Sequence, residues 1–217
     1  MAGFFRNLFG SSDKEVLVER RAHPRIPRRS TGFQQFTRAT LKPEGQNVLD
    51  LGPTSPANIQ FITGYAHKAY NEDLLTAAQD PSFVIPGEEP GTKVFDAKRF
   101  LAENLTYERG TFDAVMLWDL CDYLPEALVK PVVDRIFSIT KEKGLLLGFF
   151  HTKDAGPDAP YYRYHIANLE TLELQVGPKF QLQRVFQNRH IENLFHDYSS
   201  LKFFLGKDNI REVLIVR

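Results

Sequence analysis

The residues best suited to ligand chemistry lie in the stretch 47–58. An apolar run there ends at Gly52, which predicts a buried strand followed by a tight turn. Ser55 can cap the helix that follows, and Pro56 suits the first position of that helix. Gly52 tolerates a positive φ and has no Cβ to obstruct a close partner. A ligand could therefore approach the backbone of this turn, although an ordinary turn without a ligand fits the same residues.

Two stretches together resemble the class I S-adenosylmethionine-dependent methyltransferases. Residues 48–52, Val-Leu-Asp-Leu-Gly, are similar to the first motif of that family, and residues 112–119, Phe-Asp-Ala-Val-Met-Leu-Trp-Asp, are similar to its fourth strand. Thr54 and Pro56 replace two further glycines of the first motif. The missing Gly-x-Gly-x-x-Gly pattern disfavours NAD and FAD, which place a pyrophosphate against the helix. S-adenosylmethionine has no phosphate, and the resemblance implies it as the cofactor.

The resemblance also implies roles for individual residues. Those implied to bind the cofactor are Asp50, Gly52, Thr54, Glu72, Asp73 and Trp118. Asp119 is implied as the catalytic residue, because it could steer the cationic donor or take a proton from the acceptor. Glu72 would accept hydrogen bonds from the ribose, and it follows Asp50 at about the 20-residue spacing of nucleotide-binding folds.

Structural roles remain open for the same residues. Glu72 and Asp73 could belong to the first turn of the next helix, where acids favour the helix dipole. Asp119 could cap a helix, and Trp118 could be part of the core. His151, at the end of the predicted fifth strand, could face a substrate or lie in a solvated loop.

The order of the predicted elements indicates an α/β fold. Strands and helices alternate over residues 47–152, and right-handed crossovers join such strands into a parallel sheet. The chain then closes on two strands at 201–205 and 212–216, as the family does. We therefore predict a Rossmann-like, mostly parallel sheet with helices on both faces and a C-terminal antiparallel hairpin. The domain would span residues 45–217, with a small β insertion at about 157–187.

Residues 1–44 are predicted to form a basic N-terminal arm. Residues 1–46 hold nine Lys and Arg against four Asp and Glu, and prolines in the stretch 20–29 predict no regular structure there. The arm could fold along its own domain, or residues 1–30 could contact a partner protein or an anionic membrane surface. Deletion of residues 1–30 would then leave a folded domain.

Composition narrows the classes of protein that remain. The formal net charge of the 217 residues is zero, so the overall charge identifies no partner. A single cysteine, Cys121, excludes an internal disulfide and a cysteine-based zinc site within one chain. The sequence contains no metal-ligand spacing, no nucleic-acid-binding module, no long apolar run and no signal peptide, so we predict a cytoplasmic protein that could lie at the membrane periphery.

Two hypotheses of function follow. One is an S-adenosylmethionine-dependent methyltransferase whose acceptor the sequence does not identify; a small molecule is one option. The other is a non-catalytic binding or scaffold protein of the same fold, which contacts a partner or a membrane surface through its basic arm. Asp50, Gly52, Glu72 and Asp119 favour the first hypothesis, and the lost glycines favour the second.

Overall fold

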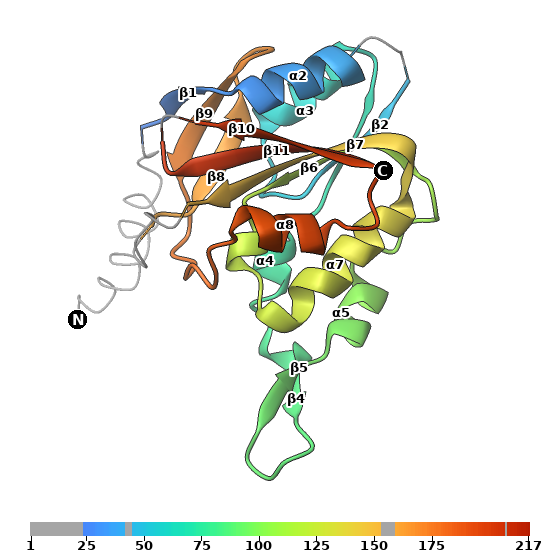
Figure 1. Cartoon of the computed structure of the whole chain (residues 1–217), viewed down its shortest axis with the longest axis vertical. Helices are drawn as coiled ribbons and strands as arrows, with labels where there is room; N and C mark the ends of the chain where they lie inside the picture. The colour runs from blue at the N-terminus through green and yellow to red at the C-terminus, as the bar shows by residue number, and fades with distance from the viewer. Residues whose placement is uncertain (1–23, 42–44, 153–158, 207) are drawn as a thin grey trace, which may run out of the picture.

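The computed structural model describes residues 24–41, 45–152, 159–206 and 208–217. A sheet of six strands with the order β10-β11-β7-β6-β2-β3 lies at the centre (Figure 1). Its strands are β2 (Asn47–Asp50), β3 (Lys68–Asn71), β6 (Phe112–Trp118), β7 (Thr140–His151), β10 (Ser200–Leu205) and β11 (Ile210–Val216). Strands β3, β2, β6 and β7 run parallel, whereas β11 is antiparallel to β7 and β10. The predicted Rossmann-like sheet with its C-terminal antiparallel hairpin is confirmed.

Helices cover both faces of this sheet (Figure 1). The core of one face includes residues of α4 (Leu74–Ala77), α5 (Ala97–Glu103), α6 (Leu120–Tyr123), α7 (Glu126–Ile139) and α8 (Asn188–Leu194). The core of the other face includes residues of α2 (Thr31–Thr40) and α3 (Pro56–Gly64). Neighbouring residues of β2 belong to different cores, Leu49 to the first and Val48 to the second. Such alternation is expected of a strand that is buried on both faces.

A second, antiparallel sheet has the strand order β1-β9-β8. Its strands are β1 (Ile26–Arg29), β8 (Tyr162–Ile166) and β9 (Thr171–Val176), so β8 and β9 lie within the predicted insertion. Tyr164 and Leu172 of this sheet belong to the same core as α2 and α3. A short 3-10 helix (Pro81–Phe83) and the hairpin of β4 (Val84–Pro86) and β5 (Lys93–Phe95) lie at the other end of the molecule (Figure 1).

Part of the predicted arm belongs to the folded structure. The prediction that prolines exclude regular structure is wrong for residues 26–29, which form β1 and pair with β9. Because β1 is an edge strand, the missing N–H of Pro27 need not break the ladder. Helix α2 follows, with Ser30 as its N-cap and Phe33 fully buried.

The remaining parts of the arm, residues 1–23 and 42–44, lie outside the described residues. The contact that was predicted for residues 1–30 with a membrane surface or a partner protein therefore stays a prediction. No helix in the described part of the chain is long and apolar enough to cross a membrane.

Deletion of residues 1–30 is now expected to destabilise the protein. The deletion removes β1 together with Arg28, which forms a buried ion pair with Glu212. Urea unfolding followed by circular dichroism should therefore give a lower midpoint for this truncated protein. Deletion of residues 1–22, which keeps every described residue, is the control. Equal midpoints for the two truncated proteins would show that β1 adds nothing to stability.

Candidate functional site

The residues predicted to form the site gather at one edge of the central sheet. Asp50 ends β2, Glu72 follows β3, and Trp118 ends β6 with Asp119 directly after it. Since these strands are parallel neighbours, their carboxyl ends lie side by side. Open α/β sheets bind ligands at this edge.

The carboxylate of Asp50 is buried, and each of its oxygens has a partner in the chain. Nε1 of Trp118 donates to Oδ1 at 2.6 Å, and Nδ2 of Asn58 on α3 donates to Oδ2 at 2.7 Å. Burial raises the pKa of Asp50 to about 6, while these two hydrogen bonds act in the opposite direction. Asp50 therefore links β2 to α3 and to the end of β6.

Gly52 makes room for the side chain of Trp118. Its φ lies outside the left-handed region, so the turn does not use the tolerance of Gly52 for a positive φ. A Cβ at Gly52 would lie 3.1 Å from Cδ1 and 3.3 Å from Nε1 of Trp118. The indole also stacks on the ring of Tyr164, with centroids 4.9 Å apart and an interplanar angle of 2°. Trp118 therefore covers the surface of Gly52 that a ligand was expected to approach.

Thr54 contributes to a small network that holds the turn. Its hydroxyl donates to Oδ1 of Asn71 at 2.5 Å. Nδ2 of Asn71 in turn donates to the backbone oxygens of Asp50 and Gly52, at 3.1 Å and 2.7 Å. The end of β3 thus fixes the carbonyl groups of the turn after β2.

Glu72 and Asp73 also have partners within the chain. Oε2 of Glu72 accepts a hydrogen bond from the backbone N of Leu105 at 3.0 Å, and the hydroxyl of Tyr107 bonds to the same carboxylate. Asp73 is the N-cap of α4 and accepts from the backbone N of Thr76. Asp73 therefore has the structural role at the start of the next helix that the sequence left open. Glu72 joins β3 to the segment that precedes β6.

Asp119 is buried at the end of β6, with 1% of its surface exposed. Its Oδ2 accepts from the hydroxyl of Tyr164 at 3.1 Å, and it makes no capping hydrogen bond to α6. Burial raises the pKa of Asp119 to about 7, an effect that His151 opposes and Asp122 reinforces. A carboxyl group that titrates near neutral pH is suited to proton transfer.

The residues at the Gly52 turn do not fit S-adenosylmethionine in this arrangement. The carboxylate of Asp50, which was expected to bind it, is already bonded through both oxygens, to Trp118 and to Asn58. The indole of Trp118 also lies against Gly52. A cofactor at this turn would first have to displace contacts that the chain makes with itself.

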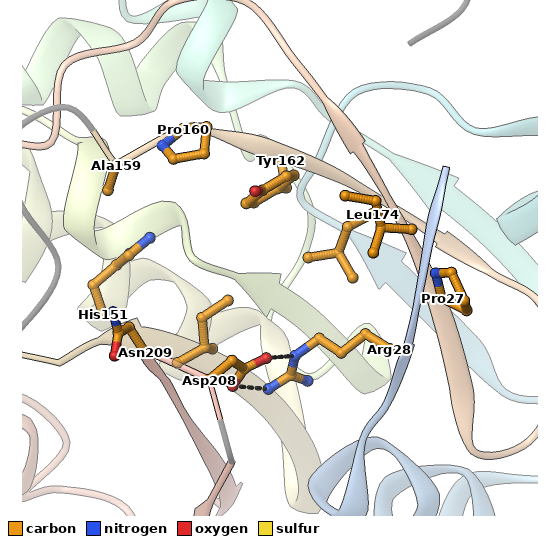
Figure 2. A pocket seen from close by; sticks show the side chains of 11 residues that line it. Pro27, Arg28, His151, Ala159, Pro160, Tyr162, Leu174, Asp208 and Asn209 are labelled. Carbon is orange, nitrogen blue, oxygen red and sulfur yellow. Dashed lines mark hydrogen bonds and ion pairs between the residues drawn. The ribbon is translucent and has the colours of Figure 1, made fainter. Parts of the chain in front are cut away.

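A separate cavity of about 400 Å³ lies between the end of β7, the β10–β11 turn and the three-stranded sheet (Figure 2). None of the predicted cofactor or catalytic residues lines it, but His151 does. His151 is only 4% exposed, so its interpretation as a solvated loop residue is wrong. Its Nδ1 lies 2.9 Å from Oδ2 of Asp122. The sequence pointed to His151 but not to its pairing with Asp122; the only signal for the pair was that His151 ends one predicted strand and Asp122 follows another.

The strand order and the antiparallel last strand agree with the class I S-adenosylmethionine-dependent methyltransferase fold that the sequence resembles. The PH0226 protein of Pyrococcus horikoshii has a similar structure, with a TM-score of 0.52 and 13% identity over 95% of this chain and 92% of that protein.

Two methyltransferases are more distant in structure. An S-adenosylmethionine-dependent methyltransferase of Methanosarcina mazei has a TM-score of 0.49 and 13% identity over 82% of this chain and 94% of its own. The 1,6-didemethyltoxoflavin-N1-methyltransferase of Burkholderia thailandensis, crystallised with S-adenosylhomocysteine, has a TM-score of 0.46 and 13% identity over 86% of this chain and 76% of its own. No family model matches the sequence, and no curated protein does. These similarities concern the fold alone.

Proposed function

We propose that this protein is a binding or scaffold protein that keeps the fold of class I methyltransferases without a methyl-donor site at the Gly52 turn. The position of Trp118 is the observation that carries this proposal. Its indole bonds to Asp50 and lies against Gly52, and so occupies two of the residues that were expected to bind the donor. The replacement of two glycines by Thr54 and Pro56 is consistent with a turn that serves a structural purpose.

We expect neither S-adenosylmethionine nor S-adenosylhomocysteine to bind. A ligand at 100 times its dissociation constant would add about 2.7 kcal/mol to the free energy of unfolding, which is easily detected as a shift in melting temperature. At millimolar concentrations of either compound, the melting temperature should stay unchanged and isothermal titration calorimetry should show no saturable heat. Saturable binding of either compound to the unmodified protein would overturn the proposal.

Methyl transfer is the second candidate, and the backbone at Trp118 favours it. The φ of Trp118 is 51°, a conformation that bulky residues rarely adopt and that tends to occur at functional sites. Movement of its side chain away from Gly52 would expose the turn to a methyl donor. Asp119, with its pKa raised by burial to about 7, would then be the residue placed to accept a proton from an acceptor. Binding in the same calorimetric experiment would favour this candidate.

A further inference from the structure

The cavity beside His151 has the size of a small-molecule site. Its volume of about 400 Å³ falls within the range of about 300–1,000 Å³ that is usual for ligand pockets. Most of its wall is apolar and is formed by Pro27, Pro160, Leu174, Ile210 and the ring of Tyr162. The ring of His151 is directed into this space from the end of β7 (Figure 2). The lining therefore suits a small, mostly apolar molecule that carries one polar group.

Asp122 fixes the tautomer of the neutral ring of His151. Oδ2 of Asp122 accepts from the backbone N of His151 at 2.6 Å and lies 2.9 Å from Nδ1. A fully buried carboxylate at this distance fixes the proton of the neutral ring on Nδ1 and leaves the lone pair on Nε2. The edge of Tyr123 packs against the ring, with centroids 5.6 Å apart. Within the described part of the chain, only Nδ1 of the ring has a hydrogen-bond partner.

The charges around His151 favour a ligand group that can give up a proton. Burial lowers the pKa of His151, but the hydrogen bond to Asp122 and the charges of Asp122, Asp119 and Asp208 outweigh this effect and raise the pKa overall. Arg28, the other basic residue in the wall, is already held in ion pairs. Among the described residues of the wall, His151 is thus the basic group that remains for a ligand.

We propose that this cavity binds a small, mostly apolar molecule with an acidic hydroxyl group, such as a phenol, and that this hydroxyl bonds to Nε2 of His151. When the ring is neutral, the hydroxyl donates to Nε2. When the ring is protonated, Nε2–H donates to the anion of the ligand. The proposal goes beyond the proposed function and does not depend on whether a methyl donor binds.

Para-nitrophenol is a suitable probe, and its methyl ether, para-nitroanisole, is the matched control without a hydroxyl. Equilibrium dialysis of the full-length protein should show saturable binding of para-nitrophenol and at least roughly tenfold weaker binding of the ether, since a hydrogen bond to a charged or charge-paired group has about this effect. Absence of saturable binding, or equal binding of the two compounds, would overturn the proposal. This comparison needs no variant protein.

Two substitutions test the role of each partner. In His151→Asn, the amide can replace Nδ1 as donor to Asp122 but removes Nε2, so binding of para-nitrophenol should weaken roughly tenfold or more. In Asp122→Asn, the amide oxygen can still accept from the backbone N and from Nδ1 of His151, but the negative charge that raises the pKa of the ring is lost, so binding of the para-nitrophenolate anion should weaken. His196→Asn, at an exposed histidine, is the control and should bind as the unmodified protein does. Unchanged binding by a folded His151→Asn variant would rule out the proposed site.

Discussion

Replacement of Glu212 by alanine is expected to lower the free energy of unfolding by about 3–5 kcal/mol, the usual effect of removing one partner from a buried ion pair. Glu212 is 2% exposed on β11. Its Oε1 accepts from Nη1 of Arg28 at 2.6 Å, and its Oε2 accepts from the backbone N of Gly32 at 2.5 Å. Alanine would leave the buried guanidinium of Arg28 with Asp208 as its remaining anionic partner and the first turn of α2 without this acceptor.

A neighbouring ion pair provides the matched control. Arg25 bonds to Glu173 at 3.0 Å, but both side chains are exposed, by 43% and 36%. Arg25→Ala should therefore cost no more than about 1 kcal/mol in the same urea titration. If Glu212→Ala were no more destabilising than Arg25→Ala, the buried pair would not stabilise the packing of β1 and α2 on the sheet.

The buried ion pair of Arg28 and Glu212 shows why the arm was harder to predict than the sheet. The strands and helices of the sheet follow from local apolar runs, turn residues and caps. Arg28, in contrast, meets a carboxylate 184 residues away in the chain, and no local pattern connects the two. Pro27 was a misleading signal, because a proline excludes a central strand position but not an edge position.

At the Gly52 turn, too, local features could be predicted, whereas a contact between residues far apart in the chain could not. Its local features, the strand, the Ser55 cap and the helix that begins at Pro56, agree with the prediction. The chemical use of Asp50 depends on Trp118, which lies 68 residues further along the chain. An aspartate at this position suits both a ligand and a structural acceptor, so the residue type alone could not distinguish the two.

Trp118→Ala is expected to lower the free energy of unfolding by about 3–5 kcal/mol, as is usual when a buried aromatic side chain is removed. The variant loses the stacking on Tyr164 and the contact with Phe149, whose ring centroid lies 5.8 Å from that of the indole. It also removes the donor to Oδ1 of Asp50. Urea unfolding measures this loss.

Trp118→Phe separates the hydrogen bond from the packing. Phenylalanine retains an aromatic ring next to Tyr164 but has no N–H, so Oδ1 of Asp50 loses its indole donor. We expect a cost of about 1–3 kcal/mol at neutral pH, the usual effect of leaving a buried polar atom unsatisfied. This cost should be smaller than that of Trp118→Ala.

The cost of Trp118→Phe should also depend on pH, in a direction set by Asp50. Burial raises the pKa of this carboxyl group from its ordinary value of 3.8 to about 6, so the folded state binds the proton more tightly than the unfolded state. The contribution of Asp50 to stability therefore falls as the pH rises from about 3.8 to about 6. The indole N–H favours the charged carboxylate, so its removal raises the pKa of Asp50 further. The difference in free energy of unfolding between the two proteins should thus be largest above the raised pKa of the variant, shrink as the pH falls toward about 6 and be small below it. A constant difference would show that Trp118 acts through packing alone.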